Sequence, residues 1–266
     1  MQSLVVFRAQ EGCTMRKSRV LLGALLATAL STAALAQEST GNIAIVYTAK
    51  PKSGSWPQLE EALAKHFGWH RAHKDDFAWI VWQVISGDNM GDFTVTTFGH
   101  SWKDFDARVK FDQADDADFV PNVLPFIDKI SLHYMEMIPE ASRPSASQQP
   151  TPLRQLTHYF VNPSGVVRFL DALKEIKAAL DKANYPVRSS WFRLVSGGEG
   201  PHYVLAVERN SWAELERPAK SLEQVLAEAT SPSKAVELMA AVRDNTRKTY
   251  SEMLQLRPDL SYFPGK

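Results

Sequence analysis

The chain contains an internal duplication, and this feature constrains its fold more than any other. Residues 86–102 read SGDNMGDFTVTTFGHSW, and residues 196–212 read SGGEGPHYVLAVERNSW, at a constant offset of 110 positions and without a gap. Self-similarity over one long period indicates two copies of the same structural unit. The sequence therefore predicts a fold built from two related halves.

Each copy of this stretch has the pattern of a β-hairpin followed by a helix. Ser-Gly turns at 86–89 and 196–200 separate apolar runs at 77–85 and 93–98 in the first copy, and at 187–195 and 203–207 in the second. Glycine and asparagine supply the positive φ angles of tight hairpins. Ser101 precedes Asp104 by three residues, as Ser211 precedes Glu214, which is close to a capping box at a helix start. We expect both helices to begin here.

The repeat extends beyond the hairpin in both directions. Leu59 and Leu63 match Phe169 and Leu173 on amphipathic helices, and a Tyr-x-Glu-Met pattern at 134–137 returns at 250–253. We expect Tyr134 and Glu136 to be equivalent to Tyr250 and Glu252, with a structural role and with His133 or His158 nearby. Each copy then has the order β-α-β-β-α-β, which is the ferredoxin-like pattern.

This duplicated order resembles the dimeric α+β barrel superfamily in its tandem fused form, over residues 43–263. The resemblance implies an α+β fold in which two ferredoxin-like repeats form an intrachain pseudo-dimeric α+β barrel. The alternative is two independent ferredoxin-like domains. The strand at 77–85 is apolar on both faces, which favours the barrel. One face carries Ile80, Trp82 and Val84, and the other carries Phe77, Trp79 and Val81.

Four segments follow along the chain. Residues 1–36 are an upstream extension and a signal peptide, residues 37–139 are the first repeat, residues 140–153 are a Pro/Ser/Gln-rich linker, and residues 154–266 are the second repeat. Arg16, Lys17 and Arg19 precede an apolar run at 20–30 and an Ala-Leu-Ala cleavage pattern at 34–36. This is the pattern of a secretory signal, with Met1 or Met15 as the start. We expect a periplasmic or secreted product without a membrane span after cleavage.

The composition argues against nucleic-acid binding and against sites built from cysteine. The 30 basic and 30 acidic residues balance, so the basic footprint of a nucleic-acid-binding protein is absent. Cys13 is the only cysteine and lies before the cleavage pattern, which excludes disulfides and thiolate metal sites in the processed chain. No familiar catalytic motif is present, so the catalytic residues and the oligomeric state remain open.

The candidate site comes from comparing the first helix of the two repeats. Ile176, Leu180 and Ala183 in the second repeat correspond to three histidines in the first. On one helical face these histidines predict a ligand pocket between helix and sheet, with tryptophans lining the same space. The expected ligand-binding residues are His66, His70, His73, Trp69, Trp79 and Trp82. Alternatively, Gly68 ends the helix and leaves His70 and His73 in a solvated loop.

No metal site is predicted from these residues. The span of the three histidines, roughly 10 Å along a helix, is too long for one ion. A His66/His70 pair could share an ion only with carboxylates from elsewhere. The acidic residues at 112–118 lack the spacing of a Ca²⁺ loop and are expected to form a solvated connection.

We therefore expect an exported protein that binds a small apolar ligand or cofactor in a pocket of the first repeat. The resemblance leaves a monooxygenase-like or haem-dependent oxidoreductase as one alternative, with haem held by a single neutral histidine. A non-catalytic structural or interaction module is the other. A small molecule is the expected partner, and fold alone does not choose among these functions.

Overall fold

The computed structural model describes residues 41–145, 147 and 149–265. The signal peptide predicted at 1–36 lies outside these residues. The eight strands are β1 (Ile43–Pro51), β2 (Ile80–Ser86), β3 (Phe93–His100), β4 (Ile127–Met137), β5 (Leu153–Val161), β6 (Ser189–Ser196), β7 (His202–Arg209) and β8 (Thr246–Leu256). The α-helices are α1 (Trp56–Ala72), α2 (Trp102–Asn122), α3 (Val166–Lys182), α4 (Leu222–Ala229) and α5 (Pro232–Asp244).

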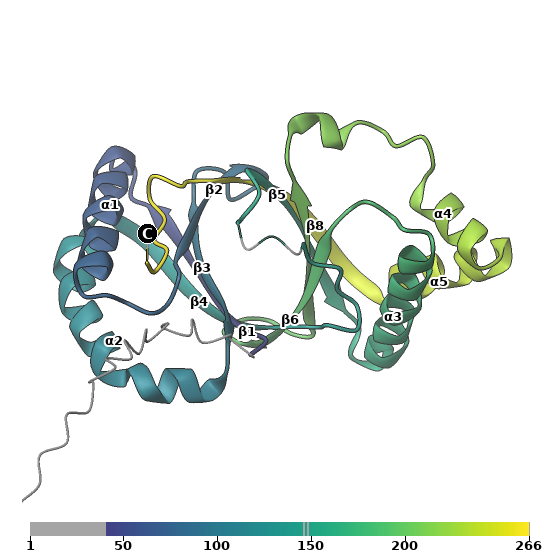
Figure 1. The fold of residues 1–266 in the computed structure, drawn as a ribbon, viewed down its shortest axis with the longest axis horizontal. Helices are drawn as coiled ribbons and strands as arrows, with labels where there is room; N and C mark the ends of the chain where they lie inside the picture. Colours follow the sequence, from purple (N-terminus) through teal and green to yellow (C-terminus); the bar gives the residue numbers. More distant parts are fainter. Residues whose placement is uncertain (1–40, 146, 148, 266) are drawn as a thin grey trace, which may run out of the picture. The chain divides into compact units, whose positions relative to one another are not determined.

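The strands form one closed antiparallel barrel in the order β1-β3-β2-β8-β5-β7-β6-β4 (Figure 1). The first repeat contributes four consecutive strands, β4, β1, β3 and β2, and the second contributes β8, β5, β7 and β6. Two pairings join the repeats, β2 with β8 and β4 with β6. The predicted intrachain α+β barrel is thus confirmed, and because it is closed it leaves no unpaired sheet edge.

Glycines at the hairpin tips help to close the barrel. Gly87 and Gly197 have φ angles of +93° and +105°, as expected for the tight turns. A Cβ at Gly197 would lie 2.1 Å from the Leu132 carbonyl oxygen, and one at Gly87 would lie 3.2 Å from that of Ser251. Each hairpin tip therefore lies against the fourth strand of the other repeat, at a spacing that a side chain would disturb.

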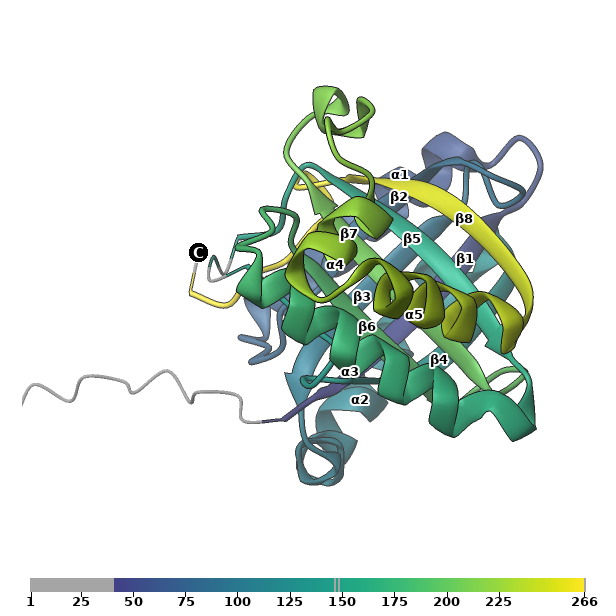
Figure 2. The same cartoon turned by 90° about the vertical axis from the view of Figure 1, so that its right-hand side faces the viewer.

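Helices cover the outer faces of the two half-barrels (Figures 1 and 2). Leu59, Leu63 and Phe67 of α1 pack on Trp79 and Phe93 of the first half. On the other side, α3 packs against the second half and against α4 and α5. Alternate residues of each strand point the other way, into the barrel. Ile80, Trp82 and Val84 form part of this inner layer.

Several predicted boundaries differ from the structure. The acidic residues 112–118, expected in a loop, lie within α2, where Arg108 Nε donates to Asp112 Oδ1 one turn away at 2.7 Å. Such a pair offsets the low helix propensity of aspartate. Between the end of α2 at Asn122 and the start of β4 at Ile127, Leu124–Phe126 make one 3₁₀ turn.

The helix start predicted at Ser101 is confirmed, since the Asp104 carboxylate accepts from the Ser101 N–H at 2.7 Å. The matching start in the second repeat is wrong. There the chain makes one 3₁₀ turn, Trp212–Leu215, and α4 begins only after Ser221, whose side chain accepts from the Gln224 N–H. No helix among the described residues is long and apolar enough to cross a membrane.

Candidate functional site

The structure brings together two of the three predicted histidines. His66 and His70 lie one turn apart on α1 and are 5% and 1% exposed. Their Nε2 atoms are 3.2 Å apart. The helix continues through Gly68, so the alternative that placed His70 in a solvated loop is wrong.

Three carboxylates surround this histidine pair. Asp118 Oδ2 lies 2.8 Å from His66 Nδ1, and Asp75 Oδ2 lies 2.8 Å from His70 Nδ1. Asp115 Oδ1 lies 3.2 Å from His66 Nε2 and 3.3 Å from His70 Nε2. Two of the three come from α2, the segment whose acidic residues were expected to face solvent.

Asp75 is the most enclosed of these carboxylates, at 2% exposure. It accepts hydrogen bonds from Arg108 Nη1 at 2.9 Å, Trp79 Nε1 at 2.8 Å and the Phe77 N–H at 3.0 Å. Burial alone would raise its pKa, but the hydrogen bonds from His70, Arg108, Phe77 and Trp79 hold the pKa of Asp75 well below its usual range. Asp75 is therefore a carboxylate at neutral pH.

The electrostatics of His66 follow from the same network. Burial disfavours the imidazolium, but the hydrogen bonds and charges of Asp115 and Asp118 outweigh it and raise the pKa of His66. The cluster has a local excess of negative charge, because Arg108 is the cation that faces Asp75 and Asp112.

The other predicted residues divide between three environments. His73 is exposed, and its ring stacks on Trp69 at 4.0 Å. Trp79 belongs to the helix layer and donates to Asp75, whereas Trp82 lies inside the barrel. The expectation that Trp79 and Trp82 line one space is wrong, because residues three apart in a strand point to opposite faces.

The layer between α1 and the sheet does not fit haem. Both ring nitrogens of His66 and of His70 already have a protein partner within 3.3 Å. The remaining space holds buried side chains, among them Phe67, Trp79 and Phe93. The layer therefore has no room for the haem ring beside these histidines.

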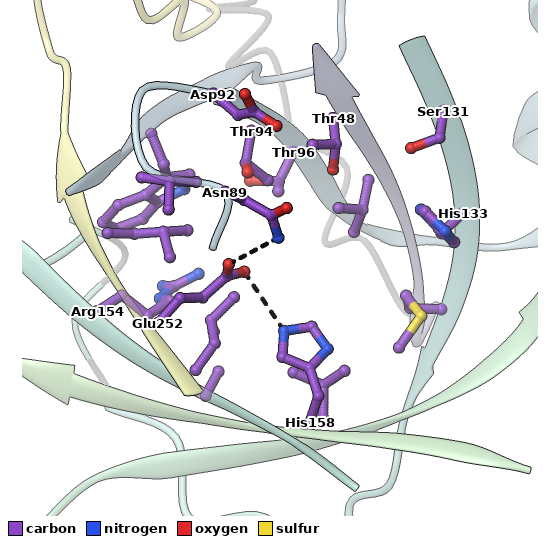
Figure 3. A pocket seen from close by; sticks show the side chains of 18 of the residues that line it. Thr48, Asn89, Asp92, Thr94, Thr96, Ser131, His133, Arg154, His158 and Glu252 are labelled. Carbon is purple, nitrogen blue, oxygen red and sulfur yellow. Dashed lines mark hydrogen bonds and ion pairs between the residues drawn. The ribbon is translucent and has the colours of Figure 1, made fainter. Parts of the chain in front are cut away.

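A cavity of about 400 Å³ lies inside the barrel and is shared by both repeats (Figure 3). Its volume is in the range of small-molecule sites. Eleven of its 25 lining residues are apolar: Ala44, Val46, Trp82, Val84, Phe98, Met135, Leu156, Phe192, Val204, Ala206 and Leu254. Sequence reasoning missed this cavity, because its lining residues are spread over all eight strands.

A buried acid–base pair faces the cavity. Glu252 Oε1 lies 3.4 Å from His158 Nε2, with both side chains about nine-tenths buried. His158 Nδ1 is 3.0 Å from His202 Nε2, and Asn89 Nδ2 donates to Glu252 Oε2 at 3.3 Å. Figure 3 shows Glu252 and His158 directed toward each other at the cavity wall. Tyr250 stacks on His158 at 4.2 Å.

Burial shifts the pKa values of two titratable groups next to this pair, His202 and Tyr250. Burial, assisted by the charges of His158 and His133, lowers the pKa of His202 to about 4. Burial next to Glu252 raises the pKa of Tyr250 to about 12. Both groups are therefore neutral near pH 7.

Three basic residues also line the cavity: Lys50, Lys129 and Arg154. Arg154 lines it and stacks on Trp82, with its guanidinium carbon 4.4 Å from the ring centre. Burial lowers the pKa of Arg154 to about 10, so it is still a cation at neutral pH. Among the described residues no ion-pair partner lies within 4 Å of it, and its Nε has no hydrogen bond. Lys50 and Lys129 are exposed and line the cavity as neighbours on β1 and β4.

Comparisons with known proteins agree with this architecture. A scan against protein-family models finds no match, and a search of curated protein sequences finds none. Among solved structures, a candidate monooxygenase from Lactobacillus acidophilus is similar with a TM-score of 0.53 and 9% identity, over 84% of this chain and 96% of its own. An anthrone oxidase-like protein has a TM-score of 0.52 and 17% identity, over 86% and 96%. A candidate monooxygenase from Fusobacterium nucleatum has a TM-score of 0.54 and 10% identity, over 80% and 91%.

The fold is that of the dimeric α+β barrel superfamily. The two halves of the barrel differ on its inner face. The expected equivalence of Glu136 with Glu252 is wrong. In β4 the inward residues are His133 and Met135, whereas in β8 they are Tyr250, Glu252 and Leu254.

A shift of one residue in a strand exchanges its two faces. Glu136 consequently lies on the outer side, where it accepts from Arg193 Nε at 2.7 Å. Tyr134 packs against Trp102 and Phe105 of α2. The expectation that His158 lies near Tyr250 and Glu252 is confirmed. The His158–Glu252 pair could have been predicted from the sequence by aligning β5 with β8, because the two side chains lie on the same face of neighbouring strands.

Proposed function

We propose that this protein is a monooxygenase-like oxidoreductase that takes a small, mainly apolar molecule into the barrel and removes a proton from it. The observation that carries the proposal is the His158–Glu252 pair at the wall of the barrel cavity. The expected substrate is a planar molecule with an acidic C–H or O–H group. Its deprotonated form delocalises the negative charge onto an oxygen atom.

The pair is placed to exchange a proton with a bound molecule, because His158 Nε2 is buried, lies within ion-pair distance of Glu252 and has no hydrogen-bond partner among the described residues. His158 Nε2 and Glu252 Oε1 are 3.4 Å apart, and without a proton both would present lone pairs to each other. A single proton on either atom removes this repulsion. A histidine and a carboxylate at this distance can accept a proton from a substrate or return one to it, which is the requirement for general acid–base catalysis.

Arg154 supports the same chemistry from the neighbouring strand. Leu156 pairs with Glu252 in the register of β5 and β8, and Arg154 lies two residues before it on the inner face. Its guanidinium lacks an ion-pair partner among the described residues, so it can receive the negative oxygen that deprotonation creates. A fixed donor aimed at developing charge stabilises such a transition state. Lys50 and Lys129 add positive charge at the solvent-exposed end of the cavity.

The similar structures support the oxidative part of the proposal. They are described as candidate monooxygenases and as an anthrone oxidase-like protein. Anthrone carries a CH₂ group made acidic by its ketone and its two rings. Its carbanion can react with dioxygen, and the balanced reaction converts anthrone and O₂ into anthraquinone and water. The residues in hand supply the base and the cation that this route needs.

Binding of an apolar ligand in the first repeat alone is less well supported. Its helix layer is filled by side chains, and the barrel cavity has walls from both repeats. The barrel is therefore the better candidate for the small-molecule site.

Anthrone oxidation tests the proposal. Purified protein is mixed with anthrone in air, and oxygen uptake and anthraquinone are both measured. We expect one O₂ consumed for each anthraquinone formed, faster than in buffer. Replacing Ala206 by Trp fills part of the apolar wall and is expected to abolish the reaction, whereas Val236→Trp on the exposed face of α5 is a matched control. Equal rates with and without protein would contradict the proposal.

We also propose that the chain is exported, on the basis of the basic, apolar and Ala-Leu-Ala segments at 16–36. Expression from the native start in a bacterium with an outer membrane should give a periplasmic product that begins near Gln37. Intact mass measurement that finds residues 15–36 on a cytoplasmic product would contradict export.

A further inference from the structure

We infer that His66, His70 and Asp115 form a binding site for a divalent transition-metal ion, with zinc favoured by the geometry. The three ligand atoms are His66 Nε2, His70 Nε2 and Asp115 Oδ1, which lie within 3.3 Å of one another. This site lies on the outer side of the sheet and is independent of the chemistry proposed for the barrel.

Lone pairs converge at the centre of this triangle. Asp118 and Asp75 accept hydrogen bonds, so they fix the ring protons of His66 and His70 on Nδ1. In the neutral form of each ring, the lone pair of Nε2 is directed at the other ring and at Asp115 Oδ1. That oxygen is buried and has no hydrogen-bond partner among the described residues, although it lies within ion-pair distance of both rings. A cation at the centre satisfies all three atoms at once.

The dimensions of the triangle fit zinc. Zinc binds histidine nitrogen at about 2.0–2.1 Å and carboxylate oxygen at about 2.0–2.2 Å, in a tetrahedral arrangement. Two ligand atoms of such a tetrahedron are separated by roughly 3.3 Å. The three observed separations are 3.2, 3.2 and 3.3 Å. Two histidines and one carboxylate also form a donor set used for iron(II), so the experiment includes that ion.

The carboxylates that hydrogen-bond to the two histidines are arranged as they are around a metal site. A ligating histidine usually donates its second ring N–H to a carboxylate, which fixes the ring and makes it a stronger ligand. Here Asp118 holds His66, and Asp75 holds His70. Asp75 is in turn fixed by Arg108 and Trp79. Three carboxylates against one guanidinium leave an excess negative charge that a divalent ion neutralises.

Solvent reaches the cluster from one side. A surface cleft of about 490 Å³ between α1 and the end of α2 is lined by His66 and Asp118, with Lys65, Pro121 and Asn122 around it. The cleft gives an ion a route to the buried histidines and leaves water as the fourth ligand. Because His66 and His70 are on α1 and Asp115 is on α2, bound metal would hold the two helices together.

The second repeat shows what this layer contains without a metal site. Ile176 and Leu180 take the positions of His66 and His70, and they pack against Leu226 and Ala235 of α4 and α5. An apolar contact holds the helices together there. The first repeat has replaced it with imidazoles and carboxylates, which would be costly to bury unless they were fully satisfied.

Zinc binding by the purified protein tests the inference. The protein is stripped with a chelator and titrated with zinc in competition with a chromophoric chelator, and bound metal is counted by mass spectrometry. We expect one zinc per chain in the wild type and in Asp116→Asn, whose side chain is exposed. Asp115→Asn should bind at least 100-fold more weakly, because a charged ligand is lost. Asp118→Asn should lower the affinity for zinc about 10–100-fold, because Asp118 holds the ligand His66 by a hydrogen bond.

Two results would overturn the inference. One is a wild-type protein that binds no zinc, and the other is an Asp115→Asn variant that binds zinc as tightly as the wild type. If Asp115→Asn does not fold, cobalt(II) in the wild type and in His70→Gln decides the question. A tetrahedral visible spectrum that His70→Gln loses supports the site, and an unchanged spectrum contradicts it. Iron(II) bound in preference to zinc would reassign the ion and overturn the choice of zinc.

Discussion

Glu252 Oε1 and His158 Nε2 lie 3.4 Å apart inside the barrel, on neighbouring strands β8 and β5. Neither is isolated, because Asn89 of the β2–β3 hairpin donates to Glu252 and His202 of β7 faces His158. The pair is thus built by residues of both repeats.

Arg154 is expected to act on ligand affinity and not on stability. Its guanidinium has no ion-pair partner among the described residues, so Arg154→Met removes a buried, unpaired cation and should leave stability unchanged or higher. Affinity for 2-naphthoate, an aromatic anion, should fall about 10–100-fold, the value of a hydrogen bond to a charged group. Tryptophan fluorescence titration measures this affinity. Arg193→Met, on the outer face, is the control, and an equal loss there would contradict the role of Arg154.

Asp75 is expected to be a major determinant of stability. Asp75→Asn removes the carboxylate that accepts from Arg108, Trp79 and the Phe77 N–H, and it leaves the Arg108 charge buried with one partner fewer. Breaking a buried ion pair costs about 3–5 kcal/mol. Urea unfolding should show this loss for Asp75→Asn and less than about 1 kcal/mol for Asp76→Asn, whose side chain is 85% exposed. Similar losses in both variants would argue against the network.

His100 is expected to make stability depend on pH. Burial, assisted by the charge of Arg108, lowers the pKa of His100 to about 4, and the charges of Asp104 and Asp75 oppose this shift. The unfolded chain takes up this proton near pH 6.5. The neutral histidine therefore contributes its full stability above pH 6.5, and this contribution is lost as the pH falls from 6.5 to 4.

Comparison with His100→Gln isolates this effect, because His202 titrates over the same range in both proteins. Between pH 7 and pH 4, the free energy of unfolding of the wild type should fall by about 2–3 kcal/mol more than that of His100→Gln. Chemical denaturation at each pH measures the difference. Parallel pH profiles for the two proteins would show that His100 titrates normally in the fold.

Much of the architecture could be predicted, because hairpin turns, helix starts and an internal duplication can be recognised directly in the sequence. The turns at Gly87 and Gly197 and the helix start at Ser101 follow from residue spacing. The α+β barrel was expected because the duplicated element order resembles the dimeric α+β barrel superfamily. The face assignment of β2 was also correct, with Phe77 and Trp79 outside and Trp82 inside.

What could not be predicted depends on strand phase and on pairing between distant segments. The matching Tyr-x-Glu-Met patterns suggested that Glu136 and Glu252 are equivalent, yet one faces outward and the other inward. Asp115 and Asp118 became partners of His66 only because α2 continues through the acidic segment. Sequence periodicity does not report which carboxylate faces which imidazole across two helices.

The most direct measurement of the central proposal is hydrogen–deuterium exchange of the CH₂ group of anthrone in D₂O under nitrogen, followed by NMR. Without dioxygen, this exchange reports proton removal alone. The wild-type protein should accelerate exchange, and Glu252→Gln should lower the rate at least about 100-fold, the lower range of general-base catalysis. Glu136→Gln, its outward-facing counterpart in sequence, should keep the full rate. Exchange that is no faster than in buffer, or that Glu252→Gln leaves unchanged, would contradict the assignment of the barrel pair as the base.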